Sequence, residues 1–199
     1  RGWIWVLARG RVFDRDEHGR PLRMAGTALD ITSPKQLDDE RAFLADVATI
    51  LGSSLEHERT LTDVAQLVTQ NLAEYCLVDL VEESGERRWL KAVGRDPAKA
   101  WICDVLMQFP PDRTRPHLTQ SAVQTKGPVL VDTATPEMIA SWSQNDLHRR
   151  ALEAMDIGSV VAVPLLAHEK LLGEIAFVRS ISSRPYNLED LRLLEGIAL

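Results

Sequence analysis

The sequence contains few residues at the spacings that catalysis or metal binding requires. No two of its five histidines form an HxxxH or HExxH pair, and none has a glutamate three residues before it. These histidines are His18, His57, His117, His148 and His168. The two cysteines, Cys76 and Cys103, are far apart and form no CxxC motif, so neither a zinc site nor a disulfide framework is expected. The sequence predicts no metal and identifies no cofactor.

The stretch "DLHRRALEAM" around His148 is the place to look for a phosphoacceptor histidine. Such a histidine normally has an acidic residue directly after it and a proline shortly beyond. Here Arg149 and Arg150 follow, and no proline does. We therefore interpret His148 as a surface or pocket-rim histidine and predict no catalytic residue in this chain.

Each cysteine is expected to be an inert part of the core. Cys76 begins an apolar run, and Cys103 lies in a predicted helix over 97–109. A thiol in such a place behaves as a small hydrophobic group unless a neighbouring cation lowers its pKa, and no such neighbour is evident.

Composition limits the classes of partner. Of the 199 residues, 45% are hydrophobic and 26% are charged, and the net charge of -6 offers no general attraction to nucleic acid or anionic lipid. No apolar run approaches the ~20 residues of a membrane span, so we expect no membrane contact and, with so few cysteines, a cytoplasmic location. The chain lacks an initiator Met and ends within a helical pattern, so we expect a fragment of a longer protein.

The first 56 residues predict a hairpin followed by a helical connector. Residues 3–31 form two β-rich runs around the turn-forming stretch "DRDEHGRP". Ser33 and Pro34 suit the start of a helix. Leucines then recur every seven residues, as in a coiled-coil seam, and the connector is interrupted near Gly52. These leucines are Leu37, Leu44 and Leu51. An ordinary core helix is the alternative.

The remaining residues indicate an α+β fold. Strands are predicted at 75–83 and 87–93, helices and loops follow, and two β-rich runs precede a final helix capped by Asn187. Both alternating sets of residues in "GSVVAVPLL" are apolar, which is typical of a strand that is covered on both faces.

Residues 43–199 resemble a GAF domain of the kind found in bacterial sensor histidine kinases and in regulators that end in a PP2C-type phosphatase. The resemblance rests on "FLADVATILGSSL", "LVTQNLAEYCLVDLVEESG", "GRDPAKA", "GSVVAVPLLAHEKLLGEIAFVRS" and "YNLEDLRLLEGIA". In addition, "GRVFDRDEHGRPLRMAGTALDIT" is similar to the two C-terminal strands of a PAS domain. The resemblance thus divides the chain into a PAS remnant at 1–32, a connector at 33–56 and a GAF domain at 57–199.

The resemblance implies an antiparallel sheet of about six strands with helices on both faces. Family members bind small ligands between the sheet and the middle helices, and they commonly dimerise through their terminal helices. It therefore implies a homodimer, with Leu37, Leu44 and Leu51 in the connector seam. The implied ligand-binding residues are Trp101, Met107, Phe109, His117, Trp142, Asn145, Leu147, Val163 and Phe177. Val163 and Phe177 would lie on the floor of the site, and the alternative is that the apolar members only fill the core.

The function implied is that of a non-catalytic sensory and signal-relay module in a multidomain bacterial protein, with a sensor histidine kinase as the expected parent. Three alternatives stay open: a regulatory domain of a PP2C-type phosphatase or cyclase, a stand-alone GAF-type enzyme acting on a small molecule, and a scaffold that only dimerises. The motifs with which some GAF domains bind bilin or cyclic nucleotides, or reduce methionine sulfoxide, are not found.

Overall fold

The computed structural model describes residues 3–53, 57–82, 84–110, 117, 122, 125–167 and 170–197. Contacts divide the chain into two units, Arg1–Thr49 and Ile50–Leu199. No helix in the described ranges is both long enough and apolar enough to cross a membrane.

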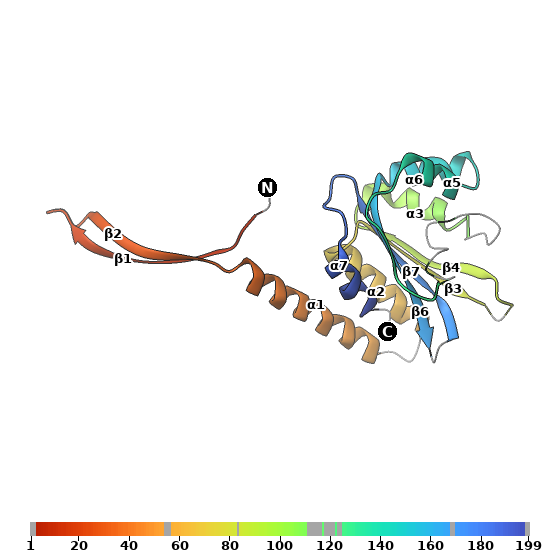
Figure 1. Ribbon diagram of the computed structural model, residues 1–199, viewed down its shortest axis with the longest axis horizontal. Helices are drawn as coiled ribbons and strands as arrows, with labels where there is room; N and C mark the ends of the chain where they lie inside the picture. Colours follow the sequence, from red (N-terminus) through yellow and green to blue (C-terminus); the bar gives the residue numbers. More distant parts are fainter. Residues whose placement is uncertain are drawn as a thin grey trace. The chain divides into compact units, whose positions relative to one another are not determined.

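The first unit begins with the predicted antiparallel hairpin, which Figure 1 shows in red. Its strands are β1 (Val6–Arg15) and β2 (Pro21–Asp30). Gly19 takes a φ of +78° in the connecting turn, a conformation that glycine adopts without strain. Nearly every residue of both strands is exposed. A two-stranded hairpin of this kind is marginally stable alone in water.

The connector helix α1 (Thr32–Ser53) begins one residue before the predicted cap. The carboxylate of Asp30 accepts a hydrogen bond of 2.9 Å from the amide of Thr32, so Asp30 provides an acceptor for a backbone donor of the first turn. Ser33 therefore lies inside the helix and does not cap it. Helix α1 ends at Ser53 and the next helix, α2, begins at His57. The predicted interruption near Gly52 extends over residues 54–56, which lie outside the described residues.

The second unit contains a five-stranded antiparallel sheet rather than one of about six strands in the part of the chain described. The strand order is β4-β3-β7-β6-β5. The strands are β3 (Tyr75–Val81), β4 (Arg87–Gly94), β5 (Val129–Val131), β6 (Ile157–Ala167) and β7 (Lys170–Ser180).

Helices cover both faces of this sheet, and Figure 1 shows two groups on opposite sides. One group is α2 (His57–Asn71) and α7 (Leu188–Glu195). The other group is the 3-10 turn η1 (Pro97–Lys99) with α3 (Ala100–Leu106), α5 (Pro136–Trp142) and α6 (Asp146–Ala154). Side-chain caps begin η1, α5, α6 and α7, and Asn187 forms the predicted cap of α7 as part of a capping box.

Alternation along the strands assigns each residue to a face. On β3, Tyr75 and Leu77 pack with residues of α3 and α6 in one core cluster, and Ala176 and Val178 of β7 join them. We call this side of the sheet the α3/α6 face. The residues between them point to the other side, where α2 and α7 lie in Figure 1. We call that side the α2/α7 face.

This assignment corrects the predicted floor of the ligand site. Val163 pairs with Ile175, and Phe177 pairs with Cys76, so both alternate with the residues of the α3/α6 cluster. Val163 and Phe177 therefore lie on the α2/α7 face. The prediction that β6 is covered on both faces is confirmed, since Val160 through Val163 are all at most 2% exposed.

Close contact between β7 and β3 makes Gly173 sensitive to substitution. A Cβ at this position would overlap the backbone oxygen of Asp79 and lie 3.0 Å from the Cα of Leu80. We expect Gly173→Ala to lower the free energy of unfolding by about 1–3 kcal/mol because the two backbones must move apart. Urea unfolding measures this loss.

Gly127→Ala is the matched control for Gly173→Ala. A Cβ at Gly127 would meet nothing closer than 3.7 Å, so this variant should stay within about 0.5 kcal/mol of the parent. Equal losses in the two variants would contradict the close-contact argument.

Candidate functional site

Three charged side chains meet on the α3/α6 face of the sheet. They are Asp79 of β3, Arg87 of β4 and Glu174 of β7, and we call them the Arg87 cluster. Arg87 binds both oxygens of Asp79, with an Nε to Oδ1 distance of 2.9 Å, and its Nη2 lies 3.1 Å from Glu174 Oε2. All three side chains are at most 2% exposed. Asp79 and Glu174 are cross-strand partners, so the sheet register itself brings them together.

The electrostatics of this cluster depend on burial. Removing charges from water is costly unless they are paired, and here two carboxylates share one guanidinium. Burial raises the pKa of Asp79 to about 6, and the charge and hydrogen bonds of Arg87 only partly oppose this rise. With both carboxylates ionised the three side chains carry a net charge of -1, and a pKa of about 6 means that Asp79 takes up a proton as the pH falls through that value.

His117 contacts the cluster from the chain between α3 and β5. Its Nε2 lies 3.3 Å from Nη1 of Arg87. Arginine can only donate hydrogen bonds, so Nε2 must be the acceptor and the imidazole carries its proton on Nδ1. Of the nine predicted ligand-binding residues, His117 is the one that touches the Arg87 cluster through a hydrogen bond that the structure describes.

Aromatic residues lie next to the cluster on the same face. Trp89 of β4 donates from Nε1 to the carbonyl of Phe109 at 2.8 Å. The Phe109 ring stacks on His148, with centroids 5.0 Å apart and an angle of 11°. Gln144 donates to the next carbonyl, that of Pro110, at 2.7 Å. These contacts fix Phe109, another predicted ligand-binding residue, against the sheet.

His148 is buried, which corrects its predicted place at the surface or at a pocket rim. Its side chain is part of the α6 packing, and Nδ1 accepts a hydrogen bond of 3.2 Å from the amide of Gln144. Burial lowers the pKa of His148, which favours the neutral imidazole. Its burial and its stacking on Phe109 explain its presence without a phosphoacceptor role.

The other predicted ligand-binding residues differ in their exposure and roles. Trp101, Met107 and Leu147 are 46%, 38% and 45% exposed, whereas Trp142 is buried in the core cluster. Asn145 accepts a hydrogen bond of 2.9 Å from the amide of His148, so its side chain caps α6.

Sequence reasoning missed the Arg87 cluster, although a signal for it was present. Asp79 and Glu174 are single acidic residues inside the apolar runs "YCLVDLV" and "KLLGEIAFV". A carboxylate in a strand that is buried on both faces needs an internal partner. Arg87 begins the strand next to Asp79 and could have been proposed as that partner.

The cysteines are buried, as the sequence predicted. Cys76 is 0% exposed and Cys103 is 9% exposed. Burial raises the pKa of both thiols. Within the described residues no group of three or more histidine, cysteine, aspartate or glutamate side chains is arranged to hold a metal ion.

The sheet with its two helical layers is shared with solved structures of other proteins. One is the GAF domain of a phosphoenolpyruvate-protein phosphotransferase from Coxiella burnetii, with a TM-score of 0.61, 14% identity, and 80% of this chain and 88% of that chain covered. Another is free methionine-R-sulfoxide reductase from Neisseria meningitidis in complex with its substrate, with a TM-score of 0.58, 17% identity, and 80% and 83% covered. At these identities the likeness concerns the fold.

The family model described as "GAF domain" matches residues 56–199, so the chain belongs to the GAF domain family. A curated relative is the Nif-specific regulatory protein of Herbaspirillum seropedicae, which is 26% identical over 172 residues. The match covers 84% of this chain, and the chain spans 30% of the length of that relative.

Removing the arginine should reveal the cost of the buried carboxylates. We expect Arg87→Ala to lower the free energy of unfolding by about 3–5 kcal/mol, because it leaves Asp79 and Glu174 buried without their shared cation. Chemical denaturation at pH 7 measures this loss.

The neighbouring Arg88 provides a matched control. It also contacts two carboxylates, those of Glu58 and Glu82, but all three side chains are 43% to 58% exposed. Arg88→Ala should cost only about 0–1 kcal/mol. A small loss in both variants would show that the Arg87 cluster is not desolvated.

Proposed function

We propose that this chain is the sensory and signal-relay region of a multidomain bacterial signal-transduction protein whose output domain is a histidine kinase. The Arg87 cluster is the observation that carries the sensory part of this proposal, and the family resemblance carries the part about the output domain. It places two carboxylates, a guanidinium and the contacting His117 on a sheet face that is otherwise apolar. Binding sites for small molecules typically combine an apolar lining with a few convergent polar groups.

The sensing site that we propose is the part of the α3/α6 face around the Arg87 cluster, with Trp89, Phe109 and His117 beside it. Electrostatic contacts are stronger at such a buried place than in water, so a ligand could be selected by its charge. The family resemblance implies the same side of the sheet. Trp101, Met107 and Leu147 would then lie on the outer surface of the helical layer that covers this face, and Trp142 would lie in the core beneath that layer.

The buried thiols support a non-catalytic role. A reactive cysteine needs a lowered pKa and access to solvent, and Cys76 and Cys103 have neither. The methionine-R-sulfoxide reductase that shares the fold is an enzyme by its name, whereas burial raises the pKa of both thiols of this chain. We therefore assign it binding and relay rather than reduction.

The parent protein is proposed to be a cytoplasmic regulator. The match to a Nif-specific regulatory protein favours a second candidate for the output domain. In this alternative to the histidine kinase, the output domain resembles that of the regulatory relative. Both outputs are compatible with a sensory region that precedes the effector.

The hairpin is proposed to be the end of a PAS domain. Its register places Val6, Ala8 and Val12 of β1 on the same face as Met24 and Ala28 of β2, and this face is mostly exposed. The opposite face carries Arg9 and Arg11 together with the exposed Leu7 and Leu29. An exposed apolar face of this kind needs a covering layer, which further strands of a PAS sheet and its core would supply.

The connector is proposed to join two copies of the chain. Leu37 and Leu44 of α1 are 52% and 36% exposed, and they are seven residues apart, as a coiled-coil seam requires. Leu51, the third predicted member, has a side chain that lies outside the described residues. The proposed partner is therefore a second copy of this chain.

A metabolite screen by thermal shift tests the sensing proposal. A compound at a hundredfold excess over its Kd stabilises the folded state by about 2.7 kcal/mol, which raises the melting temperature by about 5–10 °C in a chain of this size. We expect at least one stabiliser, and we expect Glu174→Gln to abolish its effect because that variant changes the charge of the proposed site.

Glu153→Gln is the control for this screen. Glu153 also pairs with an arginine, Arg149, at 3.0 Å, but it lies on the exposed side of α6. A compound that stabilises both variants equally binds elsewhere. A broad screen without any stabiliser would count against sensing and favour a scaffold.

Sedimentation tests the dimer. We expect the chain to sediment as a dimer at tens of micromolar, and Leu44→Asp to shift it to monomer because the substitution puts a charge into the seam. Leu172→Asp is the control, since Leu172 is similarly exposed (38%) but lies at the start of β7. A monomer for the unmutated chain would contradict the coiled-coil interpretation.

A further inference from the structure

The end of α2 is held by side chains rather than by a glycine cap. The carbonyl of Leu72, directly after α2, accepts two hydrogen bonds, from Nε of Arg179 at 3.0 Å and from the hydroxyl of Tyr186 at 3.1 Å. Carbonyls at the end of a helix have no partner within the helix, so such donors satisfy them. Both donors come from far along the chain, from β7 and from the loop that leads into α7.

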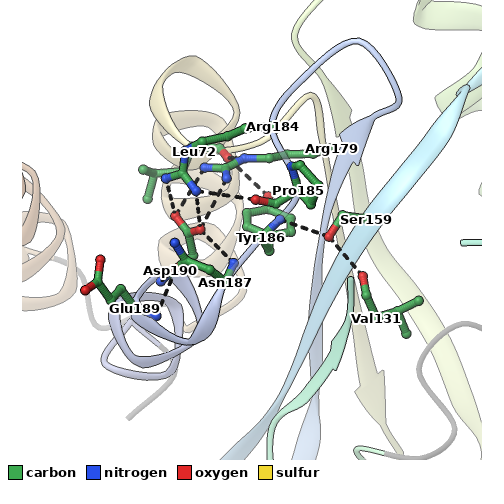
Figure 2. A network of polar contacts seen from close by, with 10 residues as sticks. All are labelled: Leu72, Val131, Ser159, Arg179, Arg184, Pro185, Tyr186, Asn187, Glu189 and Asp190. Atoms are coloured by element: carbon green, nitrogen blue, oxygen red, sulfur yellow. Dashed lines mark hydrogen bonds and ion pairs between the residues drawn. The ribbon is translucent and has the colours of Figure 1, made fainter. Parts of the chain in front are cut away.

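The start of α7 depends on the same arginine. The carboxylate of Asp190, in the first turn of α7, accepts hydrogen bonds of 3.4 Å from both terminal nitrogens of Arg179. It also accepts hydrogen bonds from the guanidinium of Arg184 at 2.6 and 2.7 Å and from the backbone amide of Asn187 at 2.9 Å. Figure 2 shows these groups converging on the Asp190 carboxylate. Burial raises the pKa of Asp190, but these hydrogen bonds and charges outweigh it and hold the pKa below its usual value.

Tyr186 adds to the connection between the end of α2 and the start of α7. The guanidinium of Arg179 lies over its ring at 4.1 Å from the centroid. Its backbone amide donates to Ser159 of β6 at 3.0 Å, and the Ser159 hydroxyl donates to Val131 of β5 at 2.9 Å. We call Leu72, Arg179, Arg184, Tyr186 and Asp190 the helix joint. It is anchored to the sheet through β5, β6 and β7.

We infer that the helix joint couples the end of α2 to the start of α7, with Arg179 as the positioning residue that holds both. A displacement that arrives along α2 is then passed to α7 on the α2/α7 face, without passing through the Arg87 cluster. This inference rests on the proposed relay function, because it makes α2 the input and α7 the output. It gives the region a relay route that works with or without a ligand.

The geometry distinguishes Arg179 from Arg184. Arg179 binds Leu72 and Asp190 at once, and its side chain is 10% exposed. Arg184 binds Asp190 but not Leu72, and its side chain is 61% exposed. Lysine keeps the charge but replaces the planar fork of donors with a single point, so it cannot hold both partners in the same way. The pair of lysine substitutions therefore separates coupling from the support of Asp190 alone.

Hydrogen exchange of the 199-residue chain tests the coupling. We expect Arg179→Lys to speed exchange about fivefold at two places, the amides of Leu72 and Ala73 and those of residues 188–195. Arg184→Lys should speed exchange only in 188–195. Amides of β3 and β6 report global unfolding and should not change in either variant.

Tyr186→Phe provides a second test that does not depend on how well the lysine variants fold. It removes only the hydroxyl, which donates its hydrogen bond to the Leu72 carbonyl at the end of α2. If the helix joint couples the two ends, exchange in 188–195 should rise together with that of Leu72 and Ala73. A rise confined to Leu72 and Ala73 would overturn the inference, as would equal rises in β3 and β6.

These outcomes are independent of the ligand screen. Coupled exchange without any stabilising metabolite would support the helix joint and count against sensing at the Arg87 cluster. A stabiliser found together with uncoupled exchange would leave sensing in place and overturn the relay route through Arg179.

Discussion

Strand β7 is buried on both faces from Gly173 to Arg179, and the polar side chains of this part must therefore find their partners inside the protein. From Glu174 to Val178 no side chain is more than 1% exposed. An unpaired charge at such a place would cost several kcal/mol, about 3–5 kcal/mol by comparison with broken buried pairs. Glu174 meets Arg87 on one face, and Arg179 meets Asp190 and the Leu72 carbonyl on the other. The buried part of β7 thus contributes a charged side chain to both the Arg87 cluster and the helix joint.

The two systems lie on opposite faces of the same strand, five residues and about 17 Å apart. The Arg87 cluster on the α3/α6 face is the proposed site at which a small molecule would bind. The helix joint on the α2/α7 face is where the terminal helices meet the sheet. This separation suits a relay, because ligand chemistry and helix coupling do not compete for the same side chains. The face on which each polar side chain lies is therefore more important for the proposed function than the number of strands in the sheet.

Local signals in the sequence predicted most of the elements. Turn residues predicted the hairpin, and Asn187 predicted the start of α7, since both depend on neighbours in the chain. The face of each strand could not be read in this way. Alternation separates Val163 from Val160, but it does not say which set meets which helices, so Val163 and Phe177 were placed on the wrong side. His148 was misplaced because its burial depends on Phe109, which is far away in the sequence.

The Arg87 cluster shows why a site can be missed even when its residues are visible. Asp79 and Glu174 interrupt apolar runs, and a carboxylate there is costly unless a cation reaches it. Well-packed apolar residues of similar volume are often as stabilising as such an ion group, or more so. Stability alone is therefore a weak reason to keep three charges in a dry sheet. The proposed selection of a ligand by its charge would supply a stronger reason, and it requires that the carboxylates and Arg87 stay within hydrogen-bonding distance of the chain that carries His117.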